Sequence, residues 1–394
     1  MKKSIFLILP AVMLMLASCM DSAGGRNGAG SVRVVLPGAS RAVSSSDKAD
    51  SYTVSLLKGG SIIESQTAVP GGAVEFDEVD AGSYTVDVEA SLSGSLSGVG
   101  SAEVAVSEGE TASCSVLMSR VYTAAQAAER ISGNNGENWN IIVAGSITDN
   151  GLSEIAGRLL TVPSDGRISL DLSRTTGLSS IGTDAFKDCA SLSSIVLPKG
   201  ITEIGDNAFF YCSSLTRIEI PDSVTTIGAS AFSSCSVLKS VAIPFSVTEI
   251  GSNLFYGCQS LESIEIPEGI TTLGNEFTFY NCKSLESVIL PNSLTEIGGS
   301  AFESCSALKS ITIPPKINKI SIKMFKDCEN LKTITFLGEI NSVESNAFEN
   351  CNILTTVNYG GNQESWNKID FGTGNDLLKN AATIICCDGT ITNS

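Results

Sequence analysis

The sequence predicts a mainly β chain with short helical or irregular segments, in which an N-terminal antiparallel β-sandwich precedes a solenoid of eight stacked units. Apolar and polar residues alternate through residues 32–119, which is typical of strands with one buried face. A 23-residue pattern recurs eight times within residues 178–361, which predicts stacking of short units. The 37 glycines indicate many turns rather than one large core.

The composition excludes several classes of function. The chain has no histidine, so Ser-His-Asp and Cys-His nucleophile pairs and histidine-ligated metals are excluded. Carboxylate-pair glycoside hydrolysis needs no histidine and stays open. The net charge of −17 argues against nucleic acid, whose phosphates require clustered Lys and Arg. We expect no cofactor, no metal and no small-molecule substrate.

Residues 1–18 have the pattern of a signal peptide, because two lysines precede a short apolar run that ends in small residues. The run is shorter than the roughly 20 residues that span a membrane. Residues 16–19 read Leu-Ala-Ser-Cys and resemble the lipobox of bacterial lipoproteins, which implies cleavage before Cys19 and diacylation of its thiol. Ordinary secretion with a chance cysteine is the alternative. The Gly- and Ser-rich residues 19–31 predict a flexible tether.

Residues 32–119 predict a prealbumin- or immunoglobulin-like β-sandwich. Tyr52, Val54 and Leu56 alternate with polar residues, and glycines separate successive runs. Residues 76–86 read Phe-Asp-Glu-Val-Asp-Ala-Gly-Ser-Tyr-Thr-Val and resemble a corner of prealbumin-like and carboxypeptidase-regulatory-like domains. We interpret the acidic residues of this hairpin as a solvated turn; a calcium loop is the alternative.

Residues 120–177 are predicted to cap the front of the solenoid, since an end unit would otherwise expose its core. The pattern indicates helices over 124–131 and 152–160, with strands near 141–144 and over 168–172.

The repeats dominate the rest of the chain. One residue is added between Asn275 and Phe279; otherwise the step is constant at 23. Each unit is too small to bury its own apolar side chains, so equivalent residues must stack into ladders. Phenylalanine stands three residues before a cysteine in every unit. Residues 215–220 have the L-x-x-L-x-L spacing of a leucine-rich repeat strand. The eight units begin at Leu178, Ile201, Val224, Val247, Ile270, Leu294, Ile317 and Ile340.

The pattern C-x-x-L-x-x-I-x-I-P-x-x-V-T-x-I-G-x-x-A-F resembles the BspA-like, Treponema-type leucine-rich repeats of bacterial surface proteins. The resemblance covers residues 178–361 and extends to residues 362–394, which look like the segment that closes such arrays as a C-terminal cap. It implies a curved leucine-rich repeat solenoid with a parallel sheet on its concave face.

The cysteines allow three interpretations: disulfides, a metal site, or buried thiols. Lipidation of Cys19 leaves eleven, an odd number that cannot pair completely within one chain. No two cysteines have C-x-x-C spacing, and a straight ladder does not form a tetrahedron. We favour reduced thiols buried in the core of the repeats.

The concave face is the candidate binding surface, because residues between the inward Leu and Ile positions must point outward. It is rich in Ser and Thr, has mixed charges and has no aromatic anchor of the kind that dominates interfaces. A merely solvated sheet is the alternative. The candidate residues are Arg217, Glu219, Lys239, Glu262, Glu265, Glu286, Lys309, Thr312, Lys332 and Thr335.

We therefore predict a non-enzymatic lipoprotein of the bacterial cell envelope, held in the outer membrane or at the cell surface by the lipid on Cys19. Its partners are the membrane and protein or glycoprotein ligands on the repeats, with no nucleic acid. The resemblance implies adhesion to host matrix or plasma proteins, or to other cells. A periplasmic scaffold or envelope-maintenance lipoprotein is the alternative. A carboxylate-pair glycosidase is disfavoured, because no Asp and Glu stand out from the solvated set.

Overall fold

A computed structural model describes residues 30–35, 49, 51–69, 73–92, 95–107, 110–113, 119–134, 136–163, 165–381 and 383–393. The signal peptide, Cys19 and most of the tether lie outside these residues, as does Cys114. The chain divides into two compact units after Thr123.

The front unit is a two-sheet sandwich, as predicted. All neighbours in the larger sheet pair antiparallel. Its order is β3 (Ser61–Ala68), β2 (Ser51–Lys58), β5 (Gly82–Leu92), β6 (Ser95–Val106) and β8 (Ser119–Tyr122). The smaller sheet has the order β4 (Ala73–Val79), β1 (Gly30–Val35) and β7 (Thr111–Ser113).

The sandwich departs from the prediction in one pairing, because β7 runs parallel to β1. The chain leaves the larger sheet at the end of β6 and enters the smaller sheet beside β1, in the same direction as that strand. The strands of this unit are therefore not all antiparallel.

The alternation in the sequence places the core of the sandwich correctly. Tyr52, Val54 and Leu56 on β2 are buried together with Val34 and Phe76 from the other sheet. Each burial of such a side chain contributes about 1.5–3 kcal/mol.

The corner at residues 76–86 is closed by a hydrogen bond. The Tyr84 hydroxyl donates to the carbonyl oxygen of Asp80 at 2.8 Å, four residues upstream. The ring of Tyr84 is buried. This bond resembles the tyrosine corner of β-sandwich domains, which fixes the chain where it enters a strand.

The second unit begins with two helices and two strands close to the predicted positions. They are α1 (Ala124–Ser132), β9 (Asn138–Ser146), α2 (Asp149–Leu159) and β10 (Arg167–Thr176). Both strands are longer than expected, and they pair parallel with each other. β10 also pairs parallel with β12 (Leu192–Val196) of the first repeat unit, so the parallel sheet begins before residue 178.

The repeats form two parallel ladders of strands. The first ladder is the predicted sheet and continues from β9 and β10. The third unit has no strand in this ladder, and a single parallel bridge between Arg217 and Ser240 connects it to the second unit. The further strands of this ladder are β12 (Leu192–Val196), β14 (Arg217–Glu219), β17 (Ser263–Glu265), β19 (Ser287–Ile289), β21 (Ser310–Ile313), β23 (Thr333–Phe336), β25 (Thr356–Tyr359) and β27 (Thr383–Cys386).

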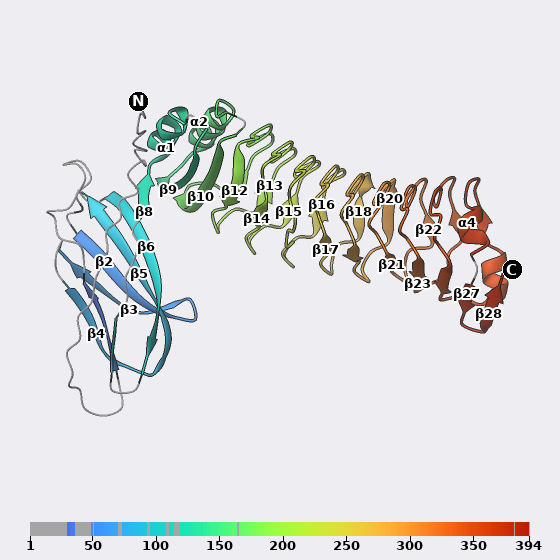
Figure 1. Cartoon of the computed structure of the whole chain (residues 1–394), viewed down its shortest axis with the longest axis horizontal. Helices are drawn as coiled ribbons and strands as arrows, with labels where there is room; N and C mark the ends of the chain where they lie inside the picture. Colours follow the sequence, from blue (N-terminus) through green and yellow to red (C-terminus); the bar gives the residue numbers. More distant parts are fainter. Residues whose placement is uncertain are drawn as a thin grey trace, which may run out of the picture. The chain divides into compact units, whose positions relative to one another are not determined.

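The second ladder was not predicted. Most of its strands have two residues, too few for an alternation to show in the sequence. They are β11 (Ser180–Ile181), β13 (Glu203–Ile204), β15 (Thr226–Ile227), β16 (Glu249–Ile250), β18 (Thr272–Glu276), β20 (Glu296–Gly299), β22 (Lys319–Ile320), β24 (Ser342–Val343) and β26 (Asp370–Phe371). Figure 1 shows the two ladders along the array, and each unit crosses between them by turns.

The repeated phenylalanines stack inside the array. Neighbouring rings from Phe186 to Phe325 have centroids 5.4–5.7 Å apart and are nearly parallel. The last pair, Phe325 and Phe348, is tilted by 30°. This spacing follows from the repeat, because hydrogen-bonded parallel strands place equivalent residues roughly 4.8 Å apart.

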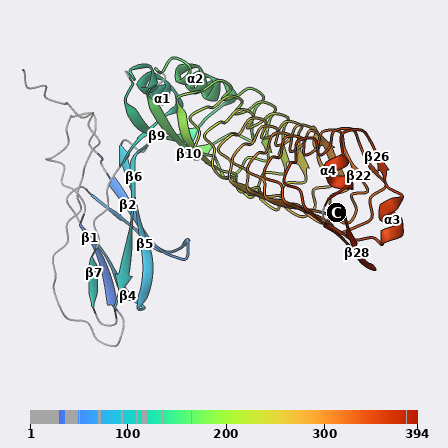
Figure 2. The ribbon, with the colours of Figure 1, turned by 45° about the vertical axis from the view of Figure 1, so that its right-hand side comes forward.

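The far end of the array is formed by α3 (Gln363–Asn367), α4 (Asp376–Lys379) and the antiparallel pair of β27 with β28 (Gly389–Thr392). Trp366 is buried there, edge-on to Tyr359 with their ring centroids 5.2 Å apart. Figure 2 shows α1 and α2 at one end of the stack and α3 and α4 at the other. We propose that residues 120–177 and 362–394 cap the two ends.

Candidate functional site

The candidate residues lie on the first ladder or directly before its strands. Arg217 and Glu219 are on β14, Glu265 is on β17 and Thr312 is on β21, and all four are exposed. Thr335, on β23, is half-buried, and its hydroxyl accepts a hydrogen bond from the Asn358 amide at 3.0 Å. The alternation of inward and outward residues along these strands is therefore as predicted.

The remaining five candidates form one column. Each stands directly after the inward leucine of its unit and is exposed. Backbone hydrogen bonds join neighbours in this column; the Glu286 amide, for example, donates to the Glu262 carbonyl at 2.9 Å. The column reads Lys239, Glu262, Glu286, Lys309 and Lys332.

Charges on this face are partly paired with one another. Lys309 Nζ lies 2.6 Å from Glu286 Oε2 in the neighbouring unit, and Arg217 pairs with Glu219 on its own strand. Exposed pairs of this kind contribute little to stability, about 0–1 kcal/mol. The face therefore presents charges of both signs rather than one strong patch.

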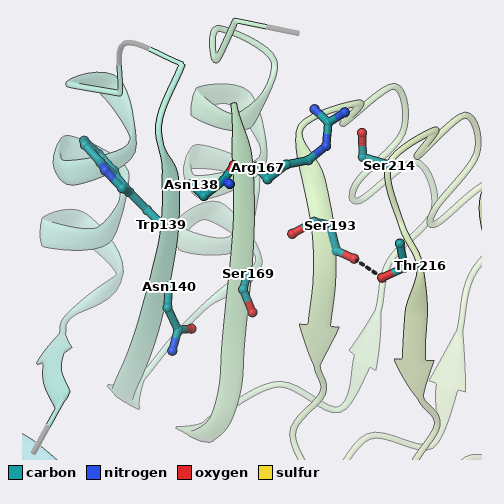
Figure 3. A pocket seen from close by; sticks show the side chains of 8 residues that line it. All are labelled: Asn138, Trp139, Asn140, Arg167, Ser169, Ser193, Ser214 and Thr216. Carbon is teal, nitrogen blue, oxygen red and sulfur yellow. Dashed lines mark hydrogen bonds between the residues drawn. The ribbon is translucent and has the colours of Figure 1, made fainter. Parts of the chain in front are cut away.

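A cavity of about 490 Å³ lies at the front of the same ladder, and the sequence did not reveal it. Asn138, Asn140, Arg167 and Ser169 reach it from β9 and β10. Trp139, Ser193, Ser214 and Thr216 complete the lining. Figure 3 shows Arg167 extending toward Ser214, whereas Trp139 extends toward α1. The Arg130 guanidinium of α1 lies 3.8 Å from the Trp139 ring centroid.

The lining of the cavity carries amide, hydroxyl and guanidinium side chains. No carboxylate, thiol or lysine is among the residues that line it. The Ser169 and Ser194 hydroxyls lie 2.5 Å apart, and the Thr216 hydroxyl donates to the Ser193 carbonyl at 3.1 Å (Figure 3). Amide, hydroxyl and guanidinium groups supply hydrogen-bond donors and acceptors.

The cavity was not predicted, because the strand expected near residues 141–144 begins three residues earlier, at Asn138. Residues 138–140 read Asn-Trp-Asn, and the apolar run that predicted a strand begins only at Ile141. A polar strand start gives no alternation signal. The outward-facing Asn140 pairs in register with Ser169, and Ser169 pairs with Ser194.

The repeated cysteines are free thiols buried in the core, as favoured from the sequence. From Cys212 to Cys351, each Sγ lies 3.1–3.2 Å from the carbonyl oxygen of the preceding unit's ladder phenylalanine. Burial raises the pKa of the Cys258 and Cys305 thiols to about 12. Such thiols are protonated and unreactive at neutral pH.

No metal-binding group of three or more Asp, Glu, Cys or His residues occurs in the part of the chain that the structure describes. Within the same residues, no helix has the length and apolar character to cross a membrane.

The fold and its open sheet face define the class of the protein: it is a leucine-rich repeat solenoid with a sandwich domain in front. The family model of the BspA type leucine rich repeat region matches residues 169–277 and 260–373, which together are more than half of the chain. The chain belongs to this family. Proteins of the family act in protein–protein interaction and surface binding, and such repeats are generally binding modules rather than enzymes.

Solved structures include similar bacterial proteins. A leucine rich cell surface protein from Faecalibacterium prausnitzii is 32% identical over 53% of this chain and 65% of its own, with a TM-score of 0.43. A leucine-rich repeat protein from Bacteroides ovatus is 27% identical over 59% and 69%, with a TM-score of 0.40.

The Leucine Rich Repeat protein of T. pallidum is 32% identical over 36% of this chain and 78% of its own, with a TM-score of 0.32. The chain thus covers just under two thirds of the F. prausnitzii protein. No curated protein matches the sequence.

Proposed function

We propose that the protein is a lipoprotein of the bacterial cell envelope that binds a protein or glycoprotein ligand through the outward face of the first ladder. The observation that carries the proposal is the continuous row of exposed side chains on this ladder. They run from the cavity at β9 and β10 to Lys332 before β23. A broad, mixed-charge surface of this kind fits a macromolecule better than a small substrate.

The envelope location rests on the sequence of the first residues. The apolar run ending in Leu-Ala-Ser-Cys supports export, cleavage before Cys19 and attachment of a lipid to its thiol. The similar F. prausnitzii protein is described as a cell surface protein. We infer that the lipid on Cys19 anchors the chain in the outer membrane and that the sandwich and the repeats face the cell exterior.

The ligand is a host matrix or plasma protein, or a protein on another cell. We expect the full chain to bind members of a panel of purified matrix and plasma glycoproteins, measured by surface plasmon resonance. Reversing two charges of the column, Lys239→Glu with Lys332→Glu, should weaken that binding about tenfold or more, which corresponds to about 1.4 kcal/mol.

A matched control is Lys199→Glu, an exposed lysine in the loop that follows β12 rather than on the sheet face. This control should leave the affinity unchanged. Equal affinity of the double variant and the unchanged chain, with intact circular dichroism, would argue against binding at this face.

Location is tested separately on intact cells. External protease should remove the protein, and Cys19→Ser should release it from the membrane fraction. Complete protection from protease would instead favour a periplasmic scaffold or envelope-maintenance lipoprotein.

A further inference from the structure

Half-buried and exposed aromatic side chains gather on one edge of the repeats. Within residues 178–361, all of which are described, six aromatic side chains are not buried. One is Phe245, in the loop after the bridge at Ser240. The other five lie in the turns that lead from the second ladder to the first. We call these five the aromatic ridge: Phe210, Tyr211, Tyr256, Phe277 and Tyr280.

Contacts within the ridge hold its rings together. Tyr256 and Tyr280 occupy equivalent positions in neighbouring units and stack with centroids 4.8 Å apart. Phe277 meets both rings edge-on, at 6.4 Å and 5.5 Å between centroids. Phe210 is two units earlier in the same row, and the residue between it and Tyr256 is the buried Ser233. No exposed polar side chain of this row therefore separates the two groups of rings.

The backbone at Phe277 is strained. Its φ is 56°, in the left-handed region that bulky side chains rarely adopt. The equivalent position in other units holds residues that tolerate this conformation better, including Asn207, Asn253 and Asn346. Phe277 also lies in the unit that carries the one added residue. The φ at this position is positive in every unit, so the repeat sets this conformation, and the aromatic ring of Phe277 opposes the local preference.

Carboxylates lie beside the ridge at its Phe277 and Tyr280 end, whereas at the other end Lys187 Nζ lies 5.8 Å from the Phe210 ring centroid. Glu276 is exposed beside Phe277, and Glu303 follows Tyr280 at the equivalent position in the next unit. Burial, and then the charges of Glu303 and Asp327, raise the pKa of Tyr280. The nearby Lys326 is paired with Glu349, their Nζ and Oε2 atoms 2.5 Å apart. The end of the ridge formed by Tyr256, Phe277 and Tyr280 thus combines ring surface with an excess of negative charge.

We propose that the aromatic ridge binds an arginine-bearing segment of a partner protein. A guanidinium group can lie against the tyrosine and phenylalanine rings while its N–H groups reach Glu276 or Glu303. Tyrosine is enriched at the energetic centres of interfaces, and the predicted binding face of the first ladder has no aromatic residue among its ten candidates. The ridge is a second interaction surface, separate from the one in the proposed function.

The test uses the full chain and a short labelled peptide that alternates Arg and Gly. Binding is followed by fluorescence anisotropy, with a second peptide that carries neutral citrulline in place of every Arg. We expect the arginine peptide to bind and the citrulline peptide to bind at least about tenfold more weakly, because the cation is lost.

Variants that restore the residues of other units remove the rings without disturbing the fold. Phe277→Asn should raise the melting temperature, because strain is relieved, and yet weaken the arginine peptide. Tyr256→Ser with Tyr280→Ser should weaken it by about tenfold, and Phe245→Ser, at an 80% exposed ring off the ridge, should not.

Three results would overturn the proposal: no binding of the arginine peptide, equal binding of the citrulline peptide, or equal weakening by Phe245→Ser. Binding of a neutral oligosaccharide at the ridge in place of the peptide would likewise overturn it. A negative result for the aromatic ridge would not contradict the proposed function of the sheet face, since Lys239→Glu and Lys332→Glu test that face alone.

Discussion

The two units build their cores in opposite ways. In the sandwich, strands far apart in sequence meet, as when β1 pairs with β7 between Ser31 and Thr111. One cluster of buried residues then serves the whole unit. In the repeats, each buried residue meets its equivalent about 23 residues away, so contacts are made with neighbouring units only. The stability of the sandwich therefore depends on contacts across the whole unit, whereas the stability of the array depends on the contacts between each pair of neighbouring repeats.

The cores also differ in chemistry. Eight thiols lie in the core of the repeats. The described part of the sandwich has no cysteine, and its core is made of aliphatic and aromatic side chains. Ionisation should therefore affect the two units to different degrees.

The largest expected effect is alkaline destabilisation of the repeats. The folded pKa of Cys189, Cys258, Cys305 and Cys351 is raised from 9.0 to about 12, mainly by burial. Stability from these thiols is complete below about pH 9 and is lost as the pH rises toward about 12, because only the unfolded chain ionises in that window. Each thiol should lower the free energy of unfolding by about 1.4 kcal/mol per pH unit.

Urea unfolding followed by circular dichroism, from about pH 8 upward, measures this slope. Cys305→Ala should make it shallower by one proton, because it removes a thiol whose pKa is raised to about 12 by burial. In the sandwich, burial raises the pKa of Tyr52, a single phenol compared with the ladder of thiols. An unchanged slope in Cys305→Ala would contradict the burial of protonated thiols.

The second-largest expected effect is the loss of ring stacking between neighbouring repeat units. Phe255→Ala removes a fully buried ring that stacks on Phe232 and Phe279, and should cost about 3–5 kcal/mol. Hydrogen exchange measured by mass spectrometry should show reduced protection in the units around residue 255 and unchanged protection in the sandwich.

The matched variant in the other unit is Phe76→Ala, which also removes a fully buried phenylalanine. Its loss of protection should spread over the whole sandwich, because one cluster serves both sheets. If Phe255→Ala destabilised every repeat equally, the description of the array as a series of neighbouring steps would be wrong.

The same contrast explains what the sequence could predict. Eight copies of one pattern identify the inward Phe, Cys and Leu positions, because a residue repeated at fixed spacing must share one environment. Alternation likewise identified Tyr52, Val54 and Leu56 as core. In both units, the buried residues were predictable because they recur at a regular spacing in the sequence.

Features whose residues do not recur at a regular spacing were not predicted. The cavity combines Asn138, Arg167 and Ser193 from three different strands, and no spacing in the sequence brings them together. The aromatic ridge depends on turns whose left-handed residues, such as Phe277, are visible only in the folded backbone. Binding surfaces are made of the positions at which repeats differ, and repetition carries no information about those.

The smallest expected effect is the loss of the corner bond in the sandwich. Tyr84→Phe removes the hydroxyl that donates to the Asp80 carbonyl at 2.8 Å and accepts from Lys58 Nζ at 3.1 Å. The ring stays buried, so only hydrogen bonding is lost, and we expect a cost of about 0.5–1.5 kcal/mol. Hydrogen exchange should speed up at the amides of β2 and β5 and stay unchanged in the repeats. A loss as large as that of Phe76→Ala would mean that the corner, rather than the shared apolar cluster, holds the two sheets together.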